Sequence, residues 1–286
     1  MTPIDTTRST EMTTDVAEPA GSGTAPRARH TAMATELPPA RGQSFLTLVR
    51  IELRKSVDTR SGRVLLLGIL ALALAGLVWR LTHLENEPVS FARFAEVSLV
   101  GVRMLLPVIG IMAMTSEWTQ RTALTTFTLS PRRARVQLAK FLAAILLSVL
   151  VLSAVMVLTL GFTALGGLID GSSPAYGSAE DGFWSGLAGI YLANALNVVM
   201  GAAFGAILAQ TAIAVVVYFV APTLWSLAAP EVFGDRADWL DVFGAFGRIA
   251  ERSFDGKLPE SLTAVAVWIV IPTIVGFWIG NRREAK

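Results

Sequence analysis

Long stretches of apolar residues, separated by short polar segments, fill most of this chain after its first 43 residues. A transmembrane helix needs about 20 such residues to cross the hydrocarbon core of a bilayer. The stretch 182–230 has no charged residue over 49 positions, so it must fold back once, and we place the turn at its polar Gln210 and Thr211. The pattern therefore predicts an all-α, polytopic membrane protein. Its six transmembrane helices are expected at 64–81, 97–116, 141–162, 185–209, 211–229 and 261–280, within a domain covering 63–286.

Two polar segments precede the first predicted span. Residues 1–43 contain no apolar run and cannot bury enough surface to offset the entropy of ordering, so we expect a disordered cytoplasmic tail. In the segment 44–62, one helical face collects the apolar residues Phe45, Leu46, Val49, Leu53 and Val57, and the opposite face collects Arg50, Arg54, Lys55 and Asp58. The spacing predicts an amphipathic interfacial helix, capped by Ser44 and ended by Ser61 and Gly62.

The composition and the missing motifs exclude several kinds of chemistry. Only 16% of the residues are charged, whereas a soluble domain has about a quarter. The chain has no cysteine and only His30 and His83, which excludes disulfides and leaves almost nothing for a histidine metal site. It has no P-loop for nucleotide phosphates and no metalloprotease motif. We therefore expect a protein that is not an enzyme, holds no cofactor or metal and binds no nucleic acid.

Basic residues are distributed unevenly between the two sides of the predicted membrane. Nine lie in 1–63, five in 117–140 and three after residue 281, which places 17 on one side and six on the other. The positive-inside rule then assigns both termini and the segment 117–140 to the cytoplasm. Arginine outnumbers lysine 20 to 4, which indicates a GC-rich bacterial genome and hence a bacterial plasma membrane.

Polar residues inside the predicted spans are the candidate functional groups. Arg103 either snorkels outward toward lipid phosphate or Glu96, or faces the bundle axis and binds an anionic group. Asn194 and Asn197 lie one turn apart; they either line a substrate pathway or hydrogen-bond between helices, the commoner role. A stripe of small residues at i+4 spacing comprises Asn197, Gly201, Gly205 and Ala209. It predicts close helix packing.

The predicted cytoplasmic loop 117–140 has the most distinctive sequence. Pro131 ends any helix running through 118–129, and an arginine cluster follows it. The loop resembles that of the membrane subunit of ABC-2 type transporters, and the matching positions are Glu117, Thr122, Leu129, Pro131, Arg132, Arg133 and Lys140. Arg121 stands where many members of that family have glycine, a departure that leaves the substrate open.

This resemblance extends over 44–286 and implies a permease subunit that exports a hydrophobic or amphipathic substrate. A separate cytoplasmic P-loop ATPase then binds the ATP, and a second permease subunit completes a homodimer or heterodimer in the bilayer. The short helix within 117–135 would be the coupling helix, with Leu124 and Phe127 as apolar anchors and with Glu117 and Arg121 fixing its orientation. The alternatives are an ion-coupled secondary transporter, a channel, or the membrane anchor subunit of an ATPase-driven complex.

The segment 230–260 forms the long outer loop before the last predicted span. One predicted helical face collects Trp239, Phe243, Phe246, Ala250 and Phe254. The resemblance implies that this region dips back into the leaflet and caps the exit. A helix resting on the outer membrane surface would show the same pattern.

Overall fold

The computed structural model describes residues 44–84, 88–119, 133–177 and 183–282, and this part of the chain folds into helices without a strand. Six helical segments are long and apolar enough to cross a membrane, which confirms the predicted fold class. They are α2 (Arg60–Thr82), α3 (Phe91–Thr119), α5 (Arg133–Asp170), α6 (Phe183–Leu208), α7 (Thr211–Phe233), and a last span made of α9 (Leu258–Val265), the π turn η2 (Ala266–Val270) and α10 (Ile271–Arg282). The remaining elements are α1 (Phe45–Asp58), the 3-10 helix η1 (Gly234–Leu240) and α8 (Val242–Glu251). The predicted tail 1–43 lies outside the described residues.

Helices α3 and α6 form the centre of the bundle. Each buries 56% of its most apolar window, compared with 22% for α2 and α7 and 17% for the last span. A Cβ atom added to Gly201 would lie 2.4 Å from the carbonyl oxygen of Pro107, and one added to Gly205 would lie 2.8 Å from that of Ile111. The two backbones are therefore in direct contact, and the predicted close packing of the small-residue stripe is confirmed.

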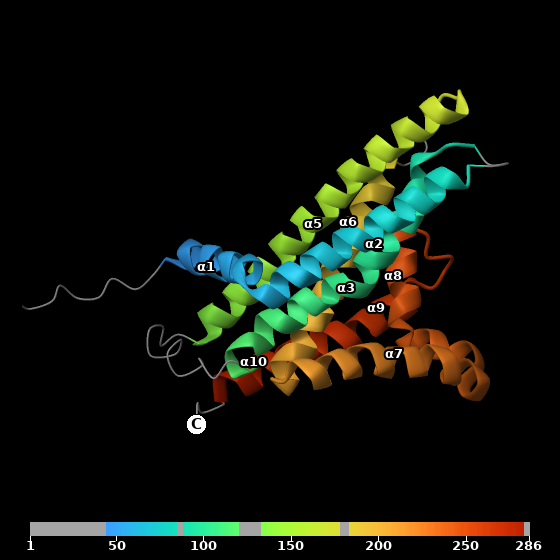
Figure 1. The fold of residues 1–286 in the computed structure, drawn as a ribbon. Coiled ribbons are helices and arrows are strands. Elements are labelled where there is room, and N and C mark those ends of the chain that lie inside the picture. Colours follow the sequence, from blue (N-terminus) through green and yellow to red (C-terminus); the bar gives the residue numbers. More distant parts are fainter. Residues whose placement is uncertain (1–43, 85–87, 120–132, 178–182, 283–286) are drawn as a thin grey trace, which may run out of the picture. The chain divides into compact units, whose positions relative to one another are not determined.

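The helix ends gather at two sides of the bundle, the α1 end and the α8 end (Figure 1). At the α1 end, Thr115 of α3 and Thr211 of α7 share a hydrogen bond of 2.7 Å between their hydroxyl groups. At the α8 end, the backbone of Ala175 accepts a hydrogen bond from Phe91 and donates one to Val89. These contacts place the end of α3 beside the start of α7, and the start of α3 beside the segment that follows α5.

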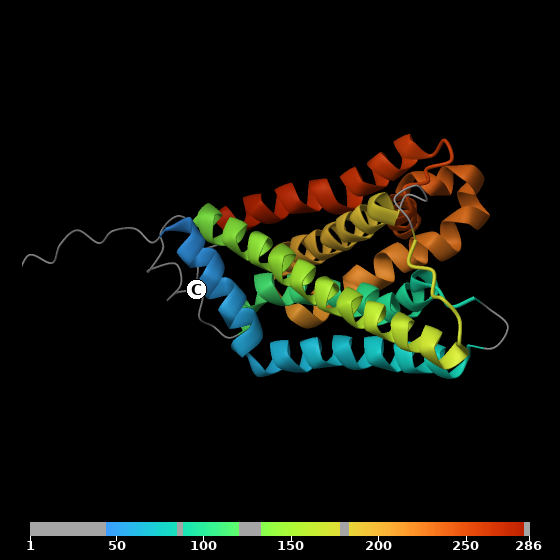
Figure 2. The same cartoon turned by 90° about the horizontal axis from the view of Figure 1, so that it is seen from above.

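The junction between α1 and α2 lies earlier than predicted. The Thr59 N–H donates to the carbonyl oxygen of Lys55 at 3.3 Å, and its hydroxyl accepts from the Gly62 N–H at 3.2 Å. Because Thr59 both closes α1 and caps α2, Ser61 and Gly62 belong to the first turn of α2, and the prediction that they end α1 was wrong. Figure 2 shows α1 turned steeply away from the direction of α2.

The buried side of α1 matches the predicted apolar face only in part. Val49 of that face is buried against α5, with Phe45 and Leu53 packed beside it, whereas Leu46 and Val57 are 77% and 42% exposed and Leu48, outside that face, is buried. Lys55, which the pattern placed on the polar face, points to a carboxylate of α3. Contacts with the neighbouring helices, and not the apolar pattern alone, set the rotation of α1. Its location in a membrane interface stays a prediction.

All six helical spans are longer than predicted, α3 and α5 by the most. Helix α3 begins at Phe91 instead of 97, and α5 covers 133–170 instead of 141–162. Residues 133–140, which were assigned to the loop, are helical because Val136 and Ala139 bury their side chains against neighbouring helices. The predicted turn between the fourth and fifth spans is confirmed, since α6 ends at Leu208 and α7 starts at Thr211.

The segment 230–260 folds as separate short pieces instead of one helix. Helix α7 continues to Phe233, η1 and α8 follow, and α9 begins at Leu258. The Asp241 carboxylate accepts from the Gly244 N–H at 3.1 Å, so α8 starts anew after η1. Trp239 is thereby separated from the face that buries Phe246, and it remains 43% exposed. The predicted continuous apolar face was wrong, because a cap interrupts the helix.

Candidate functional site

Four charged side chains from three helices meet at the α1 end of the bundle. Lys140 Nζ of α5 lies 2.8 Å from Glu52 Oε2 of α1 and 3.0 Å from Glu117 Oε1 of α3. Lys55 Nζ of α1 lies 3.1 Å from the same Glu117 oxygen. We call Glu52, Lys55, Glu117 and Lys140 the ion cluster. It connects α1 to both helices that flank residues 120–132.

Most of the ion cluster is removed from solvent. The side chains of Glu117 and Lys140 are each 4% exposed, that of Glu52 is 12% exposed and that of Lys55 is 30% exposed. Two carboxylates and two ammonium groups balance in charge. Such a buried group is stable only while each charge keeps its partner, because a stranded charge in a low-dielectric interior is costly. Lys140 is the central member, since it contacts both carboxylates.

The sequence predicted half of this cluster. Glu117 was a candidate site residue and Lys140 belonged to the resemblance, whereas Glu52 and Lys55 were missed. The available signal was a pair of opposite charges three residues apart on α1, which matches the opposite charges at the facing ends of the second and third spans. The remaining coupling residues predicted from the sequence lie outside the described residues; they are Arg121, Thr122, Leu124, Phe127, Pro131 and Arg132.

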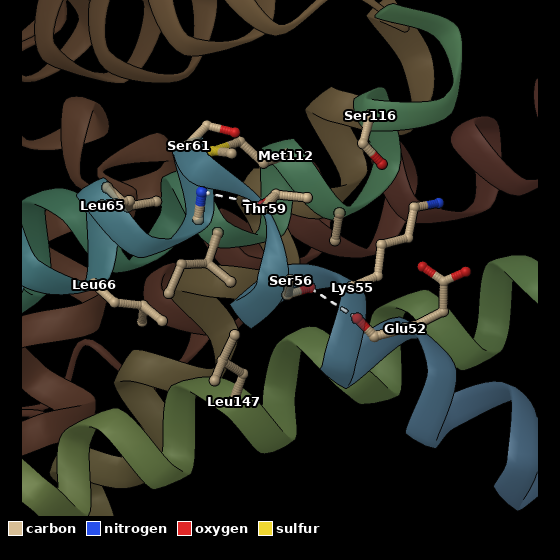
Figure 3. A pocket seen from close by; sticks show the side chains of 13 residues that line it. Glu52, Lys55, Ser56, Thr59, Ser61, Leu65, Leu66, Met112, Ser116 and Leu147 are labelled. Carbon is tan, nitrogen blue, oxygen red and sulfur yellow. Dashed lines mark hydrogen bonds between the residues drawn. The ribbon is translucent and has the colours of Figure 1, made fainter. Parts of the chain in front are cut away.

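A small cavity of about 40 Å³ lies beside the ion cluster, where α1 meets α2, α3 and α5 (Figure 3). Figure 3 shows Glu52 and Lys55 projecting from the same side of α1, away from Leu66 and Leu147. Ser116 of α3 lines the side near Lys55. The space holds a few water molecules at most. It is too small for a transported substrate and leaves the ion cluster as the main feature of this end.

A larger cavity of about 340 Å³ lies between α3, α6, α7 and α8. Its lining includes all three residues predicted as candidate pathway groups, Arg103, Asn194 and Asn197. Tyr218 of α7 also lines it and was missed, because a single tyrosine in an apolar span gives no periodic signal. We call this space the polar cavity. Tertiary packing therefore brings together in-span polar groups from three different helices.

The two asparagines play different parts in the wall of the polar cavity. Asn197 Nδ2 donates to the backbone oxygen of Arg103 at 3.1 Å, and Asn197 Oδ1 accepts from the Tyr218 hydroxyl. It thus links α6 to α3 and α7, as the commoner interpretation of the sequence predicts. Asn194 Nδ2 donates to the Ile190 carbonyl oxygen of its own helix at 2.8 Å. Asn194 Oδ1 is buried and has no hydrogen-bond partner among the described residues.

Arg103 lies exposed on α3, at the border of the polar cavity. It forms no ion pair with any described residue, so the predicted pairing with Glu96 is not formed. A neighbouring cavity of about 420 Å³ shares Arg103 and is also lined by Glu96 and Glu251. Arg103 therefore lines both the polar cavity and a cavity that has two carboxylates in its wall.

The six spans decide the class of the molecule. This is a multi-pass membrane protein. No protein-family model and no curated protein matches the chain. The ion cluster and the polar cavity are therefore the features that bear on its function.

Proposed function

We propose that the chain is the permease subunit of an ABC-2 type transporter, which exports a hydrophobic or amphipathic substrate across a bacterial plasma membrane. A separate cytoplasmic P-loop ATPase supplies the energy, and a second permease subunit completes the pathway. The observation that carries the proposal is the ion cluster. It ties α1 to the two helices that enter and leave the segment 120–132, which is where the resemblance locates the docking helix.

The ion cluster suits the transmission of a movement from that segment to the spans. Glu117 lies in the last turn of α3, and Lys140 lies two turns into α5. Opening their contact of 3.0 Å would leave each of these two buried charges with one ion-pair partner instead of two, which is unfavourable in a low-dielectric interior. A displacement of the docking segment is therefore passed to α3 and α5 together. Lys140 also contacts Glu52, so α1 follows the same movement.

Two further features support an assembly of several chains. The sequence has no phosphate-binding loop, so ATP energy would have to come from a partner. Helices α2 and α7 and the last span bury at most 22% of their most apolar windows, which leaves broad apolar sides for lipid and for a second permease subunit. Contacts between such sides in a membrane depend on close packing, since lipid is as apolar as the helices.

The docking segment is the place to test the proposal. Each Leu124→Asp and Phe127→Asp change replaces a large apolar anchor, whose burial is worth about 1.5–3 kcal/mol. We expect each to weaken ATPase association about tenfold or more. Thr125→Asp with Thr126→Asp is the matched control, because those positions fall on the other side of a helix through the segment. The measurement is the amount of P-loop ATPase that co-purifies with the tagged chain in mild detergent, together with its ATP turnover.

Undiminished co-purification of the ATPase with the Leu124→Asp/Phe127→Asp variant would contradict coupling through this segment. The alternative functions give other results. An ion-coupled transporter or a channel would move substrate in vesicles that contain the chain alone. A membrane anchor would retain an ATPase, but no transported substrate would stimulate ATP hydrolysis. Substrate-stimulated turnover that requires both chains is the result expected of a permease subunit.

A further inference from the structure

We infer that the polar cavity binds the anionic headgroup of a single-chain amphipathic molecule, with Arg103 as its counter-ion. The inference deepens the proposed transport function, on which the role of this site as a substrate site rests. Binding itself needs only the permease chain, because the described residues of four of its own elements line the cavity.

The charge of Arg103 is the first argument. Arg103 lies twelve residues from the start of α3, which is about 18 Å along the helix axis. An arginine remains protonated in proteins, and a charge at such a depth in a span is costly unless something compensates it. No described carboxylate forms an ion pair with it. An anionic ligand group would supply the missing counter-charge.

Asn194 supplies the second argument. Asn194 is 4% exposed. Its side-chain nitrogen must face the Ile190 carbonyl oxygen, because only the nitrogen can donate the hydrogen bond between them. Asn194 Oδ1 is then an acceptor without a donor among the described residues. A buried polar atom of this kind is uncommon and asks for a partner. Asn197 and Tyr218 are hydrogen-bonded to each other. The groups of the polar cavity that still lack a partner among the described residues are therefore the Arg103 cation and the Asn194 acceptor.

The apolar wall indicates the rest of the ligand. Met104, Phe219, Phe243 and Phe246 line the same cavity. Its volume of about 340 Å³ lies within the usual range for small-molecule sites. Met104 is 54% exposed, so the cavity opens on the side where Arg103 also reaches the surface. An acyl chain longer than the cavity can therefore extend into the bilayer.

The neighbouring carboxylates set the direction of the headgroup. Glu96 and Glu251 line the adjoining cavity on the other side of Arg103 and would repel an anion there. The headgroup is therefore expected on the side of Asn194. The same two carboxylates would attract the cationic part of a zwitterionic headgroup, so a zwitterion is the competing ligand that an experiment must include.

Equilibrium binding to the purified full chain in nanodiscs, without any ATPase, tests the inference. The probes are oleoyl lysophosphatidic acid, which carries a phosphate and a hydroxyl, and monooleoylglycerol, which carries hydroxyls without charge. Oleate lacks the hydroxyl, oleoyl lysophosphatidylcholine is zwitterionic, and inorganic phosphate has no chain. We expect lysophosphatidic acid to bind most tightly. Arg103→Gln should weaken its binding about tenfold or more, because a charge-assisted contact is lost, and should leave monooleoylglycerol unchanged.

Three variants complete the experiment. Asn194→Ala should weaken the binding of lysophosphatidic acid and leave the binding of oleate unchanged. Only lysophosphatidic acid has a hydroxyl group that can donate a hydrogen bond to Asn194 Oδ1. Arg236→Gln is the control, since it removes an exposed cation of η1 that does not line the polar cavity, and it should change nothing. If Arg103→Gln does not elute as a single species, Arg103→Lys replaces it. That variant keeps the charge but loses the guanidinium fork, and it should show an intermediate affinity for lysophosphatidic acid.

Equal binding of lysophosphatidic acid and monooleoylglycerol, with no effect of Arg103→Gln, would overturn the inference. So would tighter binding of the zwitterion that is lost in Glu96→Gln, or full competition by inorganic phosphate, which would indicate a site for a free anion. These results leave the ATPase test untouched. Conversely, a wild-type chain that retains no ATPase, or undiminished co-purification with the Leu124→Asp/Phe127→Asp variant, would contradict the proposed transport function and leave the measured binding in place.

Discussion

Replacing Lys140 with methionine removes the one ammonium group that contacts both carboxylates of the ion cluster. Methionine has a similar length and no charge, so the change isolates the electrostatic contribution. Glu52 loses its contact of 2.8 Å, and Glu117 loses its contact of 3.0 Å. Glu117 keeps only Lys55, whose side chain is 30% exposed. Glu52, whose side chain is 12% exposed, would then keep no ion pair among the described residues, and Glu117, at 4% exposed, would keep one.

The expected magnitude follows from this burial. Breaking a buried ion pair by removing one partner costs about 3–5 kcal/mol. For a domain of this size, a change of 1 kcal/mol shifts the unfolding midpoint by about 2–4 °C. We therefore expect Lys140→Met to lower the midpoint by about 6–20 °C. Glu117→Gln should lower the midpoint less, because Lys140 keeps its ion pair with Glu52. Lys55→Met should lower it least, because Lys55 is the most exposed member of the ion cluster.

The assay is thermal unfolding of the purified chain in detergent, followed by loss of the monodisperse peak and by tryptophan fluorescence. Arg54→Gln is the matched control. It breaks the exposed pair with Asp58 on the same helix, where the side chains are 84% and 55% exposed, and a pair of this kind contributes about 0.3–0.5 kcal/mol. If Lys140→Met shifted the midpoint no further than Arg54→Gln, or less than Lys55→Met, the cluster would not stabilise the α1 end as argued.

Three further predictions concern packing, the polar cavity and topology. Gly201→Ala should destabilise the bundle by about 1–3 kcal/mol, because the added Cβ atom would lie 2.4 Å from the backbone of α3. Gly161→Ala is the control: a Cβ atom added there has no atom within 4 Å, so the change should be neutral or stabilising by up to about 1 kcal/mol in the same thermal assay. Tyr218→Phe should cost about 1–3 kcal/mol because it leaves a buried amide oxygen of α6 unpartnered, and an unchanged midpoint would show that the hydroxyl is not needed. In this cysteine-free chain, single cysteines at 125 and 176 should react with impermeant thiol reagents from opposite sides, 125 from the cytoplasm and 176 from outside; the reverse pattern would invert the topology.

The number and class of the helices could be predicted from the sequence because they depend on local properties. A bilayer has a defined thickness, so the length of an uncharged stretch predicts how many times that stretch crosses the membrane. The fold-back at Gln210 and Thr211 followed from the same arithmetic and agrees with the end of α6 and the start of α7. The packing stripe was also predictable, since small residues at i+4 spacing allow two backbones to approach.

The exact ends of the helices were less predictable, because caps and side contacts decide them. Thr59 ends α1 by two specific hydrogen bonds, and Asp241 starts α8 by one, in places where apolar periodicity suggested other boundaries. The first turns of α5 are helical because residues such as Val136 are buried there. The caps are hydrogen bonds across a few residues, and the burial of Val136 depends on neighbouring helices, so neither can be located from hydropathy.

Which side chains meet was decided by the tertiary structure. The sequence singled out Glu117, Arg103 and the two asparagines as polar groups near or inside spans, but it could not pair them. Lipid and the sides of the helices are equally apolar, so a hydropathy pattern does not specify which helices are neighbours or how each is rotated. Only packing brought Lys140 to two carboxylates from different helices and placed Arg103 and Asn194 in the wall of one cavity. The sequence thus determines the spans, because their length must match the thickness of the bilayer. Close contacts between helices determine which side chains meet in the candidate sites.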